Sequence, residues 1–364
     1  MSAATRPFRF IAAERSYFSA KVRPALRAKG LYFEEVLPTP SAMAEIKQRT
    51  GLHFIPIVVT PENETWQDTS DILDALEARI PFPALIPATP VQRVVSYLVE
   101  LYADEFMLLP AMHYRWSTPE GKQEARDAFV AASGDRDAAL ELAKAMSGIL
   151  PALGVNETTA PAIEAHFFEM LACLETVFTD QPFLLGEQMS LADCALLGPL
   201  YAHLYLDWVP GRMVRERAPR TSHWIERMNH PLPDDFRGFR AGDELHPGVV
   251  ALLGLIGGDA APVVLDTVRD FERWADARED DGYEPPRATG FHETQLRGIP
   301  MPRYTNAYTL WMLQRPLDAY HALDATQRTA VERALAPTGC EQVLAYRARY
   351  RLDKRAYRLV CHRR

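Results

Sequence analysis

The chain contains few cysteines, and they are scattered. Its 364 residues include four, Cys173, Cys194, Cys340 and Cys361, with no Cys-x-x-Cys spacing among them. This pattern argues against the disulfide framework of a small secreted protein and favours a reducing, cytoplasmic location. The ten histidines show no metal-ligand spacing either, so we expect no metal site.

Long apolar runs and an excess of positive charge are also missing. The longest clean apolar run, Val249–Gly258, has about half of the roughly 20 residues that a membrane span needs. Arg9, Glu14 and Arg15 interrupt any apolar stretch near the start, so we expect no signal peptide. The net charge of −8, from 40 basic and 48 acidic residues, argues against a dedicated nucleic-acid binder.

The chain has the composition of an ordinary soluble globular protein. It is 48% hydrophobic and 10% aromatic, and its length predicts two or three domains. A cluster of prolines begins at Pro81, and long helical patterns follow it as far as about residue 230. We therefore predict domains over residues 1–82, 83–234 and 235–364.

The first region alternates strand and helix signals in the order β-α-β-α-β-β-α. We expect strands over 7–12, 31–37, 53–60 and 65–67, and helices over 18–29, 42–49 and 70–79. This order predicts an α/β domain with a mixed sheet and helices on both faces. The second region is predicted to be all-helical, beginning with one long helix over 91–113 on which Glu100, Asp104 and Glu105 form a solvated face. The third is predicted to be mainly helical, with one β-hairpin over 291–304 and a helix that is broken or kinked at Pro316.

One proline stands inside an apolar strand. Pro56 removes a ladder hydrogen bond there, which proteins tolerate where the peptide bond is cis or the strand is interrupted for a purpose. At the start of the third strand in this element order, such a proline is typical of a thioredoxin-like domain. The cis bond then exposes the backbone of the preceding residue, Ile55, to a peptide-like ligand. The alternative is an edge-strand proline.

Three further segments point in the same direction. Ser16–Arg23 opens the first helix, Gly186–Asp193 contains a capping box between Ser190 and Asp193, and Ala218–Met228 forms a closing helix. With these segments, residues 6–232 resemble a cytosolic-type member of the glutathione transferase superfamily. The resemblance implies a thioredoxin-like domain followed by an all-helical domain, in a protein that forms homodimers. Residues 235–364 match no family that we recognise.

The resemblance also implies roles for individual residues. Ser16 takes the place of the group that meets the glutathione sulfur, with Tyr17 and Ser19 as nearby alternatives. Ile55, before Pro56, would pair through its backbone with the cysteinyl part of glutathione. Asp68 and Thr69 would bind the γ-glutamyl end. Glutathione is then the cosubstrate, and the second substrate is an electrophilic small molecule.

These roles have independent physical reasons. A thiol with a pKa near 8.5 is mostly protonated at neutral pH, and the thiolate is the nucleophile. A serine hydroxyl can donate a hydrogen bond to that thiolate, and a helix N-terminus favours negative charge. Thr69 offers a hydroxyl and an N–H to a carboxylate at a helix start, and Asp68 can pair with an ammonium group.

Two positions depart from the family pattern. Family members often have Gln or Lys where this chain has Phe54, and the longer Glu or Gln where it has Asp68. Lys47, Arg49 or His53 would have to substitute in binding the glycyl carboxylate. Both departures favour an alternative, a non-catalytic binding or scaffold protein that acts through its C-terminal extension.

The last 24 residues are strongly basic. Residues 341–364 contain eight Lys and Arg and two acidic residues, Glu341 and Asp353. We expect this tail to dock on the acidic remainder of the chain. The alternative is a patch that binds an anionic lipid or partner.

Overall fold

The N-terminal part of the molecule is a small mixed sheet covered by helices. The structure, a computed structural model, describes residues 6–133, 135–232 and 236–364. Four strands form the sheet in the order β2-β1-β3-β4. Their bounds are Phe8–Ile11 for β1, Phe33–Val36 for β2, Ile57–Val59 for β3 and Thr65–Gln67 for β4.

Alternating strand residues bury the two faces of this sheet. β1 runs parallel to β2 and antiparallel to β3, which pairs antiparallel with β4. Phe10 and Val58 pack into the main core with α1 (Tyr17–Ala28) and α3 (Thr69–Arg79). Ile11 and Ile57 point to the other face, where α2 (Pro40–Thr50) covers them. The predicted β-α-β-α-β-β-α order with helices on both faces is confirmed.

A helical domain follows, as predicted. Its elements are α4 (Pro90–Glu105), α5 (Leu108–Trp116), α6 (Pro119–Ser133), α7 (Arg136–Gly148), α8 (Leu150–Leu153), α9 (Ala160–Val177), α10 (Leu191–Pro199), α11 (Trp208–Arg217) and α12 (Pro219–Asn229). The single helix expected over 91–113 is two helices, because the chain turns at Phe106 and Met107. A short strand β5 (Gly186–Gln188) precedes α10, and a π-helical segment, Leu200–Tyr205, continues α10.

The predicted capping box at the start of α10 is confirmed. Ser190 Oγ accepts from the backbone N–H of Asp193, and Asp193 accepts in return from the backbone N–H of Ser190. Asp193 also accepts from Leu184 N–H and from the indole N–H of Trp224. Burial raises the pKa of Asp193 to about 6. This carboxylate therefore ties the loop before α10 to α12.

The C-terminal extension contains helices and two hairpins. Its elements are β6 (Phe236–Phe239), α13 (Pro247–Leu255), α14 (Ala261–Asp276), β7 (Gly290–Leu296), β8 (Ile299–Thr305), α15 (Tyr308–His321), α16 (Ala325–Leu335), α17 (Glu341–Leu344), β9 (Tyr350–Arg355) and β10 (Arg358–Arg363). The hairpin expected over 291–304 is β7–β8. The β9–β10 hairpin and the pairing of β6 with β5 were not predicted from the sequence. α15 continues through Pro316, where a break or kink was expected.

One helical stretch in the extension is long and apolar enough to cross a membrane. It runs over Pro247–Asp276, through α13, a π-helical turn and α14, and 61% of its most apolar window is buried inside the protein. Length and composition alone are weak grounds for a span, since the core helices of soluble proteins meet the same criteria. The uninterrupted apolar run Val249–Gly258, on which the expectation of no span was based, is only part of this stretch.

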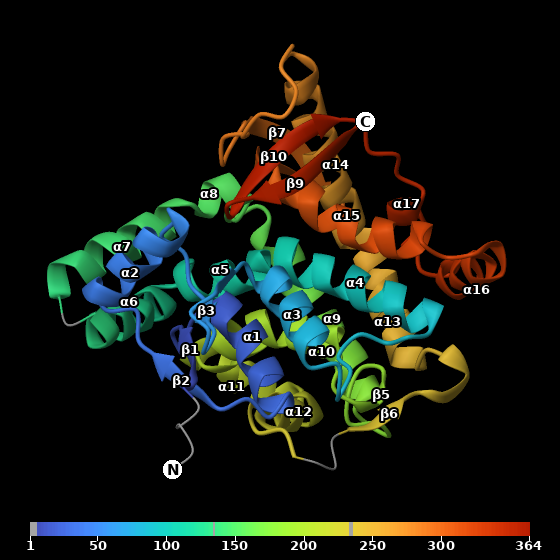
Figure 1. The fold of residues 1–364 in the computed structure, drawn as a ribbon, viewed down its shortest axis with the longest axis horizontal. Helices are drawn as coiled ribbons and strands as arrows, with labels where there is room; N and C mark the ends of the chain where they lie inside the picture. The colour runs from blue at the N-terminus through green and yellow to red at the C-terminus, as the bar shows by residue number, and fades with distance from the viewer. Residues whose placement is uncertain (1–5, 134, 233–235) are drawn as a thin grey trace.

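The extension packs directly on the rest of the protein. In Figure 1 it forms the upper and right-hand parts of the molecule, with α15 lying along α4 and α13 lying against α9. Leu310 and Leu313 of α15 are fully buried in the same hydrophobic core as Leu98 and Val94 of α4. The predicted boundary at residues 234 and 235 lies outside the described residues.

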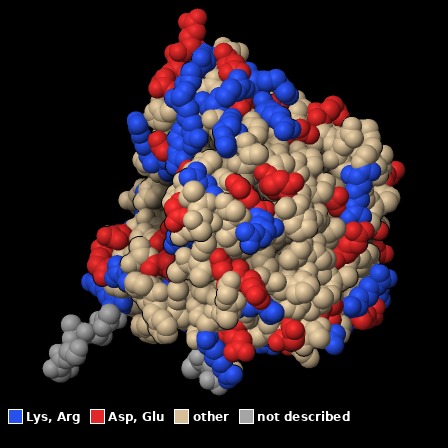
Figure 2. All heavy atoms as spheres, turned by 90° about the vertical axis from the view of Figure 1, so that its right-hand side faces the viewer, with Lys and Arg blue, Asp and Glu red and all other residues tan. Residues whose placement is uncertain are grey.

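The basic tail lies on acidic partners, as predicted. Arg349 pairs with Glu272 and Asp276, and Arg351 pairs with Asp318. Figure 2 shows Lys and Arg side chains gathered near the top of the molecule, with Asp and Glu side chains among them. Much of the positive charge of the tail is therefore neutralised within the chain.

Candidate functional site

The register of three strands brings the predicted site residues to one edge of the sheet. Ile57 faces Ile11 at the end of β1 and Gln67 at the end of β4. The residues that follow β1 and β4 and those that precede β3 therefore meet at this edge. They are the loop to Ser16, the Ile55–Pro56 step and the Asp68–Thr69 pair.

The N-termini of two helices lie at the same edge. α1 begins at Tyr17, directly after Ser16, and α3 begins at Thr69, directly after Asp68. The free N–H groups of a first helical turn attract anions, and the helix dipole adds to that attraction. The edge is therefore suited to a ligand with negative groups at two separate points.

Ser16 is the most available of the three candidate sulfur ligands. It is half-buried and caps α1, with its Oγ accepting from Ser19 N–H over 3.3 Å. Ser19 is fully buried, and its Oγ accepts from Ala13 N–H. The hydroxyl of Tyr17, also buried, donates to the carbonyl of Ala103 in the core. The Ser16 Oγ–H remains able to donate to a ligand, because the cap uses Oγ only as an acceptor.

The Ile55–Pro56 peptide bond is cis, as predicted. Pro56 is buried, whereas Ile55 is half-buried and Phe54 is 40% exposed. The guanidinium of Arg287, from the extension, lies 4.7 Å from the centre of the Phe54 ring. The position that departs from the family pattern is thus next to a cation that the sequence analysis did not identify.

Two of the three cations considered for the glycyl carboxylate are exposed. Lys47 and His53 lie at the surface. Arg49 is already engaged, since it donates to Glu45, Asn63 and Thr65. Arg287 is therefore a further candidate beside Phe54.

Both carboxylate oxygens of Asp68 are engaged by the protein itself. It has a φ of 76° and caps α3, with Oδ1 accepting from Ser70 N–H over 3.0 Å. Its Oδ2 accepts from the hydroxyl of Tyr308 over 2.7 Å and lies 3.2 Å from Nζ of Lys354. Burial is the main cause that raises the pKa of Tyr308 well above its usual value, so this hydroxyl stays protonated and donates. The carboxylate expected to bind a ligand ammonium thus already binds a lysine from the C-terminal hairpin.

Thr69 is buried at the first turn of α3, beside this cluster. The next residue, Ser70, has another function, because its Oγ donates to Glu100 and accepts from Lys21. The hydroxyls of Thr69 and Ser70 both lie at the start of α3, and that of Ser70 is engaged by buried partners in the core.

A buried charge network lies directly beneath the site. Lys21 of α1 contacts Glu100 over 2.9 Å and Asp104 over 2.6 Å, and all three side chains are essentially inaccessible. Burial opposes the charge on Lys21, but the two carboxylates outweigh it and raise the pKa of the amine. Burial also raises the pKa of Asp104, while Arg315 and Lys21 hold that of Glu100 low.

This network corrects an interpretation of α4. Glu100, Asp104 and Glu105 were expected to form a solvated face, but they are 0%, 2% and 6% exposed. Charged side chains are almost never fully buried unless they are paired. Their partners come from α1 and from the extension, where Arg315 donates to Glu100 and Thr309 donates to Glu105.

The aromatic and methionine residues of α4 and α5 form the core. Tyr102, Phe106 and Met107 are at most 1% exposed. His113 contacts Ser117 and Glu164, as expected for a helix-end histidine with satisfied hydrogen bonds. The side chains of Tyr102, Phe106 and Met107 are therefore not accessible to an electrophile.

A hollow lies beside the residue that precedes Ser16. Arg15 donates to Glu124 over 3.0 Å, and the backbone N–H of Trp208 donates to the other oxygen of Glu124. The hollow has a volume of about 590 Å³, and Trp208, which is 67% exposed, forms part of its wall. It offers an aromatic surface close to the start of α1.

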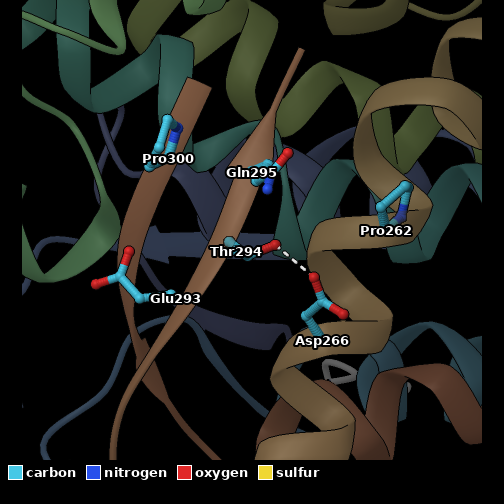
Figure 3. Close-up of a pocket in the computed structure, with 6 residues that line it drawn as sticks. All are labelled: Pro262, Asp266, Glu293, Thr294, Gln295 and Pro300. Atoms are coloured by element: carbon cyan, nitrogen blue, oxygen red, sulfur yellow. Dashed lines mark hydrogen bonds between the residues drawn. The ribbon is translucent and has the colours of Figure 1, made fainter. Parts of the chain in front are cut away.

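A second hollow is in the extension, away from the predicted site. It measures about 480 Å³ between α14 and the β7–β8 hairpin, and Figure 3 shows Asp266 and Thr294 facing one another in it. The Thr294 hydroxyl already donates to Asp266 over 2.7 Å. Its lining has two carboxylates, one hydroxyl and one amide, and none of the six lining residues is a cation.

The cysteines and the possible metal ligands add no further site. All four cysteines are free, and three of them are buried. Within residues 6–133, 135–232 and 236–364, no group of three or more His, Cys, Asp or Glu is arranged to hold a metal ion.

Sequence reasoning missed the residues that the extension contributes. Tyr308 and Lys354 lie 240 or more positions after Asp68 in the chain, and Arg287 lies more than 230 positions after Phe54. No local pattern links them to the first domain. The basic composition of residues 341–364 predicted that this segment docks on the rest of the chain, but it did not predict which residues it contacts.

Comparison with known proteins agrees with this architecture. The family model "Glutathione S-transferase, N-terminal domain" matches residues 15–79, and "Glutathione S-transferase, C-terminal domain" matches residues 138–231. A curated relative, an uncharacterised glutathione-transferase-like protein named YibF from Escherichia coli, is 28% identical over 113 residues. The aligned part is 31% of this chain and 56% of that protein.

Solved structures of glutathione transferases are also similar to this chain. One, from Methylobacterium radiotolerans in complex with glutathione sulfonate, is 22% identical, with a TM-score of 0.40 over 64% of this chain and 95% of that one. The β-etherase LigF from Sphingobium is 19% identical, with a TM-score of 0.46 over 63% and 97% of the two chains. The two family models match in order along the chain, so residues 15–79 and 138–231 are similar to the N- and C-terminal domains of glutathione S-transferases.

Proposed function

We propose that the protein is a glutathione-transferase-like enzyme that directs a glutathione thiolate at an electrophilic small molecule. The proposal rests mainly on one observation, the strand register that aligns the cis Ile55–Pro56 step with the Asp68–Thr69 pair. Three solved structures similar to this chain are complexes with glutathione or glutathione sulfonate. We extend glutathione to this chain as cosubstrate.

Each residue at the sheet edge has a chemical role in this proposal. The backbone of Ile55 pairs with the cysteinyl unit, as a strand would, and the N–H and hydroxyl of Thr69 hold the γ-glutamyl carboxylate. Ser16 donates from Oγ to the thiolate at the N-terminus of α1. A charge-assisted hydrogen bond is worth about 1.5–3 kcal/mol, which lowers a thiol pKa by roughly 1–2 units. That shift brings a thiol with a pKa near 8.5 close to neutrality.

The hollow beside Trp208 is the proposed position of the electrophile. It adjoins Arg15, the residue before Ser16, through the Arg15–Glu124 contact. An exposed indole gives an apolar, polarisable surface for an aromatic substrate. Conjugation, dehalogenation, ether cleavage and isomerisation all begin with the same thiolate attack, so one site serves each of them.

Calorimetric titration with reduced glutathione tests the binding step. Cells hold this thiol near millimolar concentration, so a Kd near 1 mM, about −4 kcal/mol, is sufficient. We expect saturable binding that Thr69→Ala weakens at least fivefold. Thr329→Ala, an exposed threonine on α16, is the matched control and should leave the Kd unchanged. A Thr69→Ala variant that binds as tightly as the unmodified protein would refute the placement of the ligand.

The alternative is a non-catalytic binding or scaffold protein that acts through the extension. One observation favours it, since Lys354 and Tyr308 occupy the Asp68 carboxylate. A glutathione-dependent reaction with an aryl halide, lost in Ser16→Ala, would support the enzyme. Glutathione binding with no turnover of any electrophile would support the alternative.

A homodimer and a cytoplasmic location complete the proposal. Free cysteines suit a reducing compartment. A dimer would have twice the 41.0 kDa of one chain. Light scattering coupled to gel filtration distinguishes the two masses, and a single species at the mass of one chain would contradict the dimer.

A further inference from the structure

The side chain of Lys354 fills a site built for a cation. Its Nζ lies 2.8 Å from Oδ2 of Asp71, 3.2 Å from Oδ2 of Asp68 and 3.4 Å from the centre of the Trp311 ring. The ring of Tyr308 lies further out, at 5.8 Å. Two carboxylates and an aromatic face are the groups that attract an ammonium ion most strongly. We call Asp68, Asp71, Trp311 and Tyr308 the ammonium cage.

The C-terminal hairpin holds Lys354 in this cage. Lys354 is on β9, one residue before its end, and pairs with Leu359 of β10. At the turn, the hydroxyl of Tyr357 donates to the carbonyl of Thr65 on β4, and Arg358 donates to the carbonyl of Gly51. These contacts attach the turn to the first domain at two points, so the position of Lys354 is fixed by more than its own ion pairs.

Both carboxylate oxygens of Asp68 already have partners within the protein. Its Oδ1 accepts from Ser70 N–H, and its Oδ2 accepts from Tyr308 and Lys354. A ligand ammonium arriving at Asp68 would have to displace Lys354 or lie beside its positive charge. A ligand carboxylate at Thr69 would instead gain a neighbouring cation in addition to the α3 N-terminus.

We propose that Lys354 determines ligand specificity by supplying, from within the chain, the ammonium group that a γ-glutamyl thiol would bring to Asp68. The site then prefers a thiol that has the γ-glutamyl carboxylate and lacks the free α-ammonium. This inference rests on the proposed function, because it takes Asp68 and Thr69 as the end of the glutathione site. It adds to that function the charge pattern of the thiol that fits best.

Two thiols that differ only in the ammonium group test the inference. Glutathione has the group, and glutaryl-cysteinyl-glycine is the same molecule without it. Calorimetric titration of the full chain should give a Kd at least tenfold lower for the glutaryl thiol. Lys354→Met, which keeps an unbranched apolar side chain and removes the ammonium group, should reverse this preference in favour of glutathione.

Two further variants separate charge from structure. Lys354→Arg keeps a cation in the cage and should retain the preference of the unmodified protein. Arg355→Met changes the next residue of the hairpin, which is exposed, and should leave both Kd values unchanged. Because Lys354→Arg tests charge without emptying the cage, the inference remains testable if Lys354→Met does not fold.

The outcomes distinguish this inference from the function on which it rests. If the unmodified protein binds both thiols equally, or Lys354→Met keeps the same preference, Lys354 has no role in specificity and the proposed function stands. If no variant binds either thiol at millimolar concentration, both the inference and the proposed function are overturned.

Discussion

Arg315 of α15 donates from Nε to Oε2 of Glu100 on α4 over 2.7 Å, and Glu100 is completely buried. The same guanidinium donates twice to Asp74 of α3. One side chain of the extension therefore joins the first two domains and neutralises a carboxylate inside the core. This contact indicates that the extension is a structural part of the fold.

The first prediction concerns this contact. Arg315→Met leaves Glu100 buried with Lys21 as its remaining cation, and Lys21 also serves Asp104. Removing one partner of a buried ion pair costs about 3–5 kcal/mol. Urea denaturation should show a loss of this size. Arg351→Met, which removes a partly exposed pair with Asp318, should cost under about 1 kcal/mol. Equal losses in the two variants would contradict the structural role of Arg315.

The second prediction concerns the extension as a whole. Deleting residues 235–364 removes Arg315 and also Arg303, which donates to the carbonyls of Glu105 and Leu153. It also exposes the apolar face of α4 that α15 covers. We expect the truncated chain to lack a cooperative unfolding transition and to be degraded at once by a trace of protease. A soluble fragment with a sharp transition would show that residues 6–232 fold alone.

Local patterns predicted the first domain well. The strands follow from β-branched runs, the start of α3 from turn residues, and the cis Ile55–Pro56 step from a proline inside an apolar strand. Each of these signals involves only a few neighbouring residues. The capping box of Ser190 and Asp193 is likewise a signal of four residues. Each of these features depends on neighbours in the sequence, so each could be predicted from it.

The parts that could not be predicted depend on distant partners. Glu100 was interpreted as solvent-facing because nothing near it in the sequence neutralises it, and its partners Lys21 and Arg315 are 79 and 215 positions away. The same applies to Asp68, whose contact with Tyr308 spans 240 positions. Ion pairs and hydrogen bonds between residues so far apart in the chain produce no local or periodic pattern in the sequence.

The third prediction concerns the proposed sulfur ligand. Ser16→Ala removes the hydroxyl that would stabilise a bound thiolate, so the pKa of bound glutathione should rise by roughly 1–2 units. Ultraviolet absorbance of the thiolate, followed against pH, measures this shift directly. Conjugation should slow by roughly 10–100-fold near pH 6.5 and by much less above pH 9, where the thiol ionises unaided.

Tyr17→Phe is the matched control for that experiment. Its hydroxyl is committed to the Ala103 carbonyl in the core, so its loss should leave the thiol titration unchanged. A shift in Tyr17→Phe with none in Ser16→Ala would assign the sulfur to Tyr17.

The last prediction is a pH dependence of stability that depends on Glu45 of α2. Arg9 of β1 donates to both of its oxygens over 2.8 and 2.9 Å, and Arg49 adds a third hydrogen bond. The hydrogen bonds from Arg9 are the largest cause that lowers the pKa of Glu45, from 4.5 to about 2. Because the folded state favours the ionised carboxylate, the stabilisation is complete above about pH 4.5 and disappears as the pH falls towards 2.

Glu45→Gln should therefore lower the free energy of unfolding by about 2 kcal/mol at pH 7. The difference from the unmodified protein should shrink steadily below pH 4.5, as measured by urea denaturation at a series of pH values. A double-mutant cycle with Arg9→Met isolates the pair, and its coupling energy should fall with pH over the same range. A coupling energy that is constant from pH 7 to pH 3 would mean that Arg9 does not hold Glu45 in its ionised form.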